Sequence, residues 1–170
     1  KYRARLSVAE QNGRAGSVVQ DVNVPDFSSQ PLVMSGLTVS GAAAAQAPTA
    51  RLKDDPITPV LMTVPTTQRE FARDDRLLVF AEVYENARNA QPHMVELATE
   101  VRADGGTVVF NSREQRSSTE LQGGRGGYGY RTEVPLAELA PGLYVVHVEA
   151  RSLASSSPTG VGRDVVIRVR

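Results

Sequence analysis

The sequence predicts an all-β fold in which short strands form two packed sheets. Apolar and polar residues alternate with a period of two along most of the chain, as they do in half-buried strands. Turn signals separate about nine such stretches at intervals of roughly 8 to 14 residues. The composition is rich in Val, Thr, Ser, Gly and Pro and contains no tryptophan, a mixture that favours strands over helices. Together these observations indicate a β-sandwich.

The first predicted element is a β-hairpin over residues 2–24. Both of its strands alternate, and Asn12-Gly13 between them favours a turn because both residues tolerate a positive φ. An isolated hairpin is marginally stable in water, so we expect this one to pair with something. If it docks, four apolar residues should become buried: Leu6, Val8, Val22 and Val24.

The remaining strands are predicted from residue 32 onward. The stretch DRLLVFAEVYE, residues 75–85, is nearly all apolar and therefore predicts a central strand covered on both faces. The chain closes with a second hairpin over 142–170, and the segments 41–56 and 111–127 are predicted to be loops. The expected main core comprises Phe71, Val79, Phe80, Val83, Leu97, Tyr144, Val146 and Val148.

Two segments far apart in the sequence share one pattern. KYRARLSVAEQN aligns with the segment PGLYVVHVEARS so that Tyr2 corresponds to Tyr144 and Leu6 to Val148. Each segment is followed by a turn that contains glycine and then by a valine-rich strand. We interpret this as an internal repeat with a period of about 142 residues, whose copies are the terminal hairpins of two sandwich modules.

The repeat predicts the domain organisation. Residues 1–27 are assigned to the terminal hairpin of a preceding module, residues 28–31 to a linker, and residues 32–170 to one sandwich module. The chain begins at Lys1 without an initiator Met or a signal peptide, so we expect an internal fragment or a processed chain.

A short motif before the penultimate strand narrows the fold class. The segment LAPGLYVVHVEA resembles the corner found in fibronectin type III and immunoglobulin-like modules, where the Tyr hydroxyl bonds back to the backbone. The resemblance implies an immunoglobulin-like or fibronectin III-like β-sandwich. The residues that match this tyrosine corner are Leu139, Pro141, Gly142 and Tyr144.

A second resemblance covers most of the chain. The segments GSVVQDVNVPDFSSQPLVMSGLTV, REFARDDRLLVFAEVYEN and LAPGLYVVHVEARS follow one another along the chain. This order resembles the C-terminal β-region of secreted bacterial von Willebrand factor A-related proteins, in which Val-Pro-Asp leads into Leu-x-x-Ser-Gly. The resemblance implies an extracellular or cell-envelope location. The A domain of that family carries an Asp-x-Ser-x-Ser metal site, and this chain has no such pattern. The matching residues are Val24, Pro25, Asp26, Leu32, Ser35 and Gly36.

Composition excludes several classes of function. Nineteen basic residues balance nineteen acidic ones, so no net field attracts nucleic acid or an anionic membrane. The chain has no cysteine, which excludes disulfides and Cys-ligated zinc. No apolar run approaches the roughly 18 to 20 residues that a membrane-spanning helix requires. We therefore expect no nucleic acid partner and no membrane insertion.

Glycines, histidines and serines of the sequence form no convincing catalytic set. Residues 124–129, GRGGYG, fit G-x-G-x-x-G, but a strand follows where a dinucleotide site needs a helix. His147 is expected on the exposed face of its strand and His93 in an exposed turn, without partners for acid–base work. The serine-rich segments lack G-x-S-x-G. We expect no enzymatic activity and no cofactor.

Two ligand-binding alternatives remain open. Calcium could bind the loop carboxylates of Asp54-Asp55 or Asp74-Asp75, although no D-x-D-x-D-G loop is present and adjacent Asp residues usually cap turns. A glycan could stack on a platform of tyrosines, although we expect these to pack within the sandwich or at its edge. The tyrosines are Tyr84, Tyr128 and Tyr130.

The sequence therefore supports three hypotheses about function. The favoured one is a non-enzymatic module of a secreted or envelope protein that acts as a spacer and interaction surface. The second is a self-assembling structural subunit that uses residues 2–24 for strand donation to another chain, since exposed strand edges accept further strands. The third is a glycan-binding accessory domain of a hydrolase. A protein partner or self-association is expected under the first two.

Overall fold

A computed structural model describes residues 1–41, 64–86, 91–121, 128–154 and 159–170. Over this part, the chain forms eleven strands and one short helix, α2 (Ser118–Leu121), which is neither long nor apolar enough to span a membrane. The strands are β1 (Tyr2–Ala9), β2 (Ala15–Val22), β3 (Leu32–Met34), β4 (Thr38–Ser40), β5 (Glu70–Phe71), β6 (Arg76–Glu85), β7 (Met94–Ala103), β8 (Val108–Ser117), β9 (Tyr128–Pro135), β10 (Gly142–Ser152) and β11 (Gly160–Val169).

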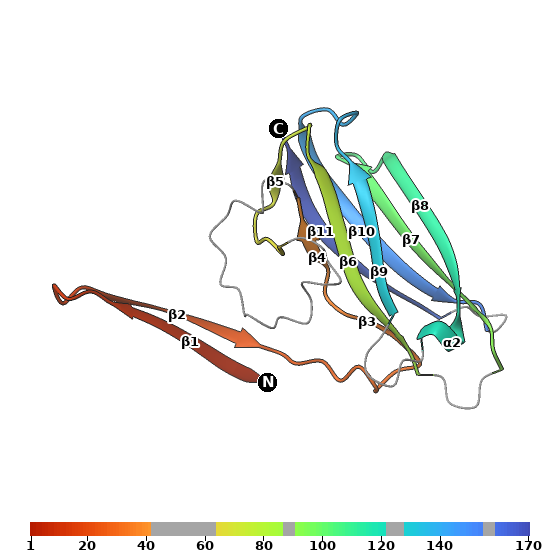
Figure 1. The fold of residues 1–170 in the computed structure, drawn as a ribbon, viewed down its shortest axis with the longest axis horizontal. Coiled ribbons are helices and arrows are strands. Elements are labelled where there is room, and N and C mark those ends of the chain that lie inside the picture. Colours follow the sequence, from red (N-terminus) through yellow and green to blue (C-terminus); the bar gives the residue numbers. More distant parts are fainter. Residues whose placement is uncertain (42–63, 87–90, 122–127, 155–158) are drawn as a thin grey trace.

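Two sheets face each other, and a two-stranded ribbon projects from them (Figure 1). One sheet has the order β5-β11-β10-β7-β8, and all of its pairs are antiparallel except β5–β11. In the other sheet, β9 pairs along β6, whereas β3 and β4 pair with two successive parts of it. Because a strand has two edges, β3 and β4 share the edge opposite β9. The predicted all-β sandwich is confirmed.

The main apolar core of the described residues lies between the two sheets. Seven of the eight predicted core residues belong to it: Phe71, Val79, Val83, Leu97, Tyr144, Val146 and Val148. Phe80 was predicted wrongly, since it is buried with Leu78 in a separate small cluster. Successive residues of a strand point to opposite faces, and Val79 takes the inward position. β6 is thus covered on both faces, as the apolar run of residues 75–85 predicts.

Part of a predicted loop is a strand. The segment 111–127 was expected to be irregular, yet residues 111–117 continue β8 and residues 118–121 form α2. β8 lies at the edge of its sheet, and its inward-facing positions are only half-buried. Polar residues such as Ser112 and Glu114 are tolerated there because their side chains keep contact with water.

The chain enters and completes the sandwich at opposite ends. Leu32 at the start of β3 pairs with Glu85 at the end of β6. Phe71 of β5 pairs with Val169 at the end of β11, and only residues 72–75 separate β5 from the start of β6. The start of β3 and the end of β11 therefore lie about the length of β6 apart, as Figure 1 shows.

Candidate interaction surface

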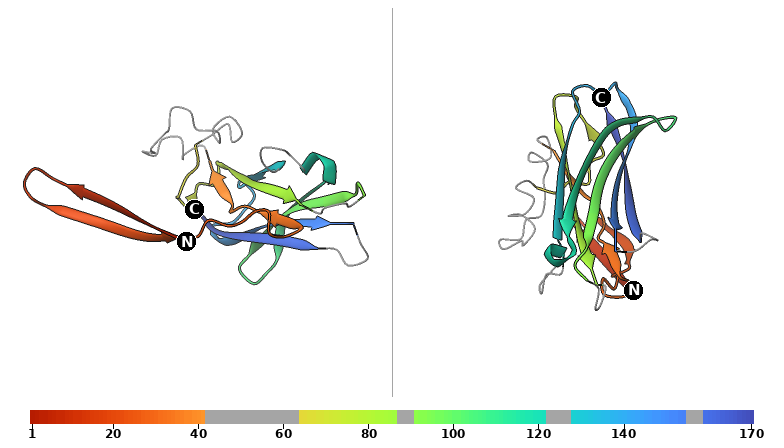
Figure 2. Two further views of the ribbon diagram at one scale, coloured as in Figure 1. Left: turned by 90° about the horizontal axis from the view of Figure 1, so that it is seen from below. Right: turned by 90° about the vertical axis from the view of Figure 1, so that its right-hand side faces the viewer.

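The N-terminal hairpin extends away from the sandwich as a two-stranded ribbon (Figures 1 and 2). β1 and β2 pair with each other and with no other described strand, and every residue of both strands is exposed. The Glu10 amide donates to the Arg14 carbonyl at 2.8 Å and closes the loop. Gly13 has a φ of 85°, which glycine adopts without strain, so the predicted Asn12-Gly13 pair lies in the turn.

The pairing register gives this ribbon one apolar side. Tyr2 lies opposite Val22 and Leu6 opposite Val18, and directly opposed residues point to the same face. We call the side formed by Tyr2, Leu6, Val8, Val18 and Val22 the apolar face of the hairpin. The exposed fractions of these residues are 69, 68, 73, 67 and 40% respectively.

The expected burial of the hairpin does not occur within the described part of this chain. Leu6, Val8, Val22 and Val24 are all exposed, Val24 by 64%. The physical reason is that the sandwich already contains its own terminal hairpin: β10 pairs with β7 on one edge and with β11 on the other, and both β10 and β11 contribute to the core. The place beside β7 that a hairpin of the same kind would take is therefore occupied by β10.

The opposite side of the ribbon is polar and internally paired. The Arg3 guanidinium contacts the Asp21 carboxylate at 2.7 Å, and this hydrogen bond raises the pKa of Arg3. Lys1 lies 3.8 Å from the same carboxylate. Val19 shares this side and is 52% exposed. The ribbon is therefore amphipathic, which is typical of a sheet edge that covers a core with one face and meets water with the other.

The segment between β2 and β3 that includes the predicted linker is held by hydrogen bonds. We call residues 26–31 the joint. The Asp26 carboxylate accepts hydrogen bonds from the hydroxyl and the backbone amide of Ser28, at 2.7 and 2.9 Å. Both bonds lower the pKa of Asp26, and the bond from the Ser28 hydroxyl has the larger effect. The Phe27 ring stacks on Tyr84 near the end of β6, with centroids 4.9 Å apart and planes inclined by 9°. The joint thus packs directly against the sandwich.

One side chain fastens this joint. The Asn86 amide nitrogen donates to the carbonyl oxygens of Phe27 at 2.6 Å and Gln30 at 3.0 Å. The Asn86 backbone amide donates to the Pro31 carbonyl at 2.6 Å. Sequence reasoning did not find Asn86, because its partners are backbone atoms that lie more than 50 positions away and leave no residue pattern.

The residues that match the tyrosine corner lie in the turn from β9 to β10 and in the first residues of β10. The Tyr144 hydroxyl donates to the Ala140 carbonyl at 2.7 Å, the backward bond expected at such a corner. Leu139 is 6% exposed and belongs to the core, Pro141 precedes β10, and Gly142 is the first residue of β10. This corner fixes the start of β10, and through it the position of the terminal hairpin of the sandwich.

Replacing Tyr144 by Phe should destabilise the sandwich by about 1 kcal/mol, because the hydroxyl leaves and the Ala140 carbonyl loses its donor. Urea denaturation would measure the change. Tyr2→Phe is the matched control, since Tyr2 is 69% exposed and should lose nothing. Equal midpoints for Tyr144→Phe and wild type would contradict a structural role for this bond.

A charged depression of about 240 Å³ lies on the outer face of the five-stranded sheet. Its groups are largely paired: Glu100 contacts Arg102 at 2.7 Å and Arg113 at 3.5 Å. The Arg102 hydrogen bond is the main cause of a lowered pKa at Glu100. The lining residues are Glu96, Ala98, Glu100, Arg102, Arg113, His147, Glu149 and Arg151. Paired charges of this kind are typical of a solvated sheet face.

The two histidines occupy different environments. His147 points outward, as expected, and its Nδ1 lies 2.7 Å from the Asp164 carboxylate. His93 was expected to be exposed in a turn, but its side chain is only 8% exposed. It directly precedes β7. Its Nε2 lies 3.5 Å from the buried carboxylate of Glu85 at the end of β6, and its Nδ1 lies 2.9 Å from the Gln91 carbonyl oxygen. The local pattern did not reveal this burial, because Glu85 belongs to β6, which lies in the other sheet from β7, the strand that follows His93.

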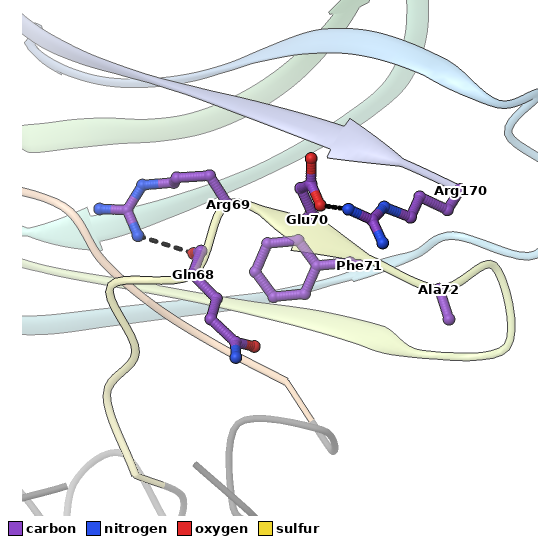
Figure 3. A pocket seen from close by; sticks show the side chains of 6 residues that line it. All are labelled: Gln68, Arg69, Glu70, Phe71, Ala72 and Arg170. Carbon is purple, nitrogen blue, oxygen red and sulfur yellow. Dashed lines mark hydrogen bonds and ion pairs between the residues drawn. The ribbon is translucent and has the colours of Figure 1, made fainter. Parts of the chain in front are cut away.

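An open pocket of about 470 Å³ lies beside β5 and the end of β11 (Figure 3). The Glu70 carboxylate pairs with the Arg170 guanidinium and lies 3.7 Å from Arg168. Arg69 donates to backbone carbonyls. The pocket is lined by Gln68, Arg69, Glu70, Phe71, Ala72 and Arg170. The one carboxylate of this lining, Glu70, is thus engaged in ion pairs with two arginines.

The remaining candidates are accounted for as follows. Tyr130 is 2% exposed, and its hydroxyl lies 2.9 Å from the Thr99 hydroxyl. The Asp75 carboxylate accepts from the Arg76 amide at 2.8 Å, which is a turn-capping role. Asp54-Asp55, the side chain of Tyr128 and residues 124–127 of the glycine-rich motif lie outside what the structure describes. Within the described ranges, no group of three or more His, Asp or Glu side chains is arranged to hold a metal ion.

Comparison with known proteins gives little. No protein-family profile matches the chain, and no curated protein sequence does. Among solved structures, the chain is similar to a calcium-binding mutant of β-glucuronidase 2 from Bacteroides uniformis, with 17% identity and a TM-score of 0.42. The alignment covers 78% of this chain and 13% of that one. At this identity and TM-score, the similarity bears on neither the activity nor the substrate of this chain.

Proposed function

We propose that this chain is a non-enzymatic β-sandwich module of a secreted or cell-envelope bacterial protein, acting as a spacer and an interaction surface. The observation that carries the proposal is the contrast between its two parts. The sandwich closes an apolar core between its sheets, whereas the hairpin exposes five large apolar residues on the face that they share with Gln20. The resemblance to the C-terminal β-region of von Willebrand factor A-related proteins supports the location.

Fractionation of the bacterium that produces the protein would test this location. An antibody against residues 32–170 should detect the protein in the envelope fraction or in the culture medium. A cytoplasmic enzyme of known reaction serves as the control for cell breakage. Detection only with that control enzyme would contradict the proposal.

Self-assembly through the hairpin is a second candidate function. Both outer edges of the ribbon are unpaired among the described strands, and such edges accept strands from other chains. Light scattering after size exclusion should then give a mass above 18.3 kDa that rises with concentration. Val18→Lys should restore the monomer, whereas Val19→Lys on the polar side should not. A monomer at every concentration would argue against self-assembly.

A further inference from the structure

We infer that the hairpin is the terminal pair of strands of a second β-sandwich, formed by a preceding segment of the same protein. The inference rests on the proposed function, because it names the partner of that interaction surface. In it, β1 and β2 would take the places that β10 and β11 take in the described sandwich.

The two hairpins have the same construction. Tyr2 begins β1 and pairs with Val22 of β2, and Tyr144 near the start of β10 pairs with Ile167 of β11. The first strands then continue with small or aliphatic residues at every second position, as the sequence repeat requires. Both hairpins are antiparallel, so in each of them the first strand starts next to the point where the second strand finishes.

The equivalent faces have opposite environments. Tyr144, Val146, Val148 and Ala150 are 6, 0, 0 and 0% exposed. On the hairpin, the corresponding face is 40 to 73% exposed at its five large apolar residues. An isolated two-stranded hairpin is only marginally stable, and a contiguous exposed apolar face usually marks an interaction site. Because the two hairpins share one residue pattern, we expect strands of the same kind to pack against both.

The described sandwich shows what that cover consists of. β7 pairs antiparallel with the edge of β10 that does not face β11, from Tyr144 opposite Ala103 to Ser152 opposite Val95. The sheet built on β6 and β9 packs against the inward face across the core. A partner for the hairpin must therefore provide a strand with an open edge and an apolar sheet that faces it.

A second copy of the described sandwich does not meet this requirement. Its position beside β7 is filled by β10, and its core is closed. The sequence repeat instead places the missing strands ahead of the hairpin, as residues 32–141 lie ahead of β10. The ribbon extends away from the described sandwich (Figure 2).

Cysteine labelling can test the docking, because the chain contains no cysteine and any introduced thiol is unique. Val18→Cys places a thiol on the apolar face, and Val19→Cys places one on the polar side of the same strand. Each variant is prepared in the 170-residue chain and in the protein extended upstream of Lys1 as its gene encodes it. Reaction with a maleimide is then followed over time.

In the 170-residue chain, both thiols should react at similar rates. In the extended protein, the Val18→Cys thiol should react at least about tenfold more slowly, because labelling then requires local opening. The Val19→Cys rate should stay nearly unchanged, since the outer face of the equivalent β11 leaves Val166 54% exposed.

Equal rates for Val18→Cys in the two proteins would overturn the inference, as would an upstream sequence without strand pattern. Protection of Val18→Cys in the 170-residue chain that grows with its concentration would overturn it in favour of pairing between copies. None of these outcomes depends on where the protein is located, so failure here is distinct from failure of the proposed function.

Discussion

Leu97→Ala is expected to destabilise the sandwich by about 2 to 4 kcal/mol. Leu97 is fully buried in β7, the strand that lies between β8 and β10. Truncation removes its transfer free energy and leaves a cavity that two flanking strands cannot easily close. Chemical denaturation followed by circular dichroism would measure the lower midpoint.

The matched control for this substitution lies in the same sheet. Val166→Ala also removes methyl groups from a strand residue, but Val166 is 54% exposed on the outer face of β11. Its effect should stay within about 0.5 kcal/mol, as is usual for surface positions. If Leu97→Ala and Val166→Ala shifted the midpoint equally, the assignment of the core would be wrong.

Asn86→Ala is expected to release the joint with little effect on the sandwich itself. The variant leaves the carbonyls of Phe27 and Gln30 without their donor, whereas the Phe27–Tyr84 stack stays. Two lost hydrogen bonds are worth about 1 to 3 kcal/mol, so local opening should become roughly 5- to 150-fold more frequent.

Hydrogen exchange would report this opening directly. The backbone amide at position 86 remains in the variant and bonds to the Pro31 carbonyl, so its exchange should accelerate. Amides in β7 should exchange as before. Asn111→Ala is the control, because Asn111 lies on an edge strand and makes one long bond of 3.4 Å to Glu100. Unchanged exchange at position 86 would show that Asn86 does not hold the joint.

Periodicity predicted the sandwich well because burial in a sheet is periodic. Leu97 and Val101 are buried at alternate positions of β7, as their spacing indicates. The error at Phe80 has the same origin, since a run that is apolar on both faces does not say which face meets the main core. Residues 111–117 were missed because an edge strand carries polar side chains on both faces.

The candidate surface was predicted only in part. The alternation of β1 and β2 identified the amphipathic ribbon, but a pattern shows which face is apolar and not whether anything covers it. The exposure of Leu6 and Val8 therefore required the structure. Asn86 and the pair of His93 with Glu85 depend on contacts between segments that are distant in sequence or in different sheets, and these leave no local signal.

The opposite placement of the start of β3 and the end of β11 has a mechanical consequence. Tension on the polypeptide would enter at β3 and leave at β11, two points separated by roughly 30 Å along β6 at about 3.3 Å per residue, and would act along the strands and across the core between the two sheets. The hydrogen bonds of Asn86 to the joint would carry the same tension, because the joint directly precedes β3. A tether built from such units would behave as a stiff rod, and it would yield first at its joints.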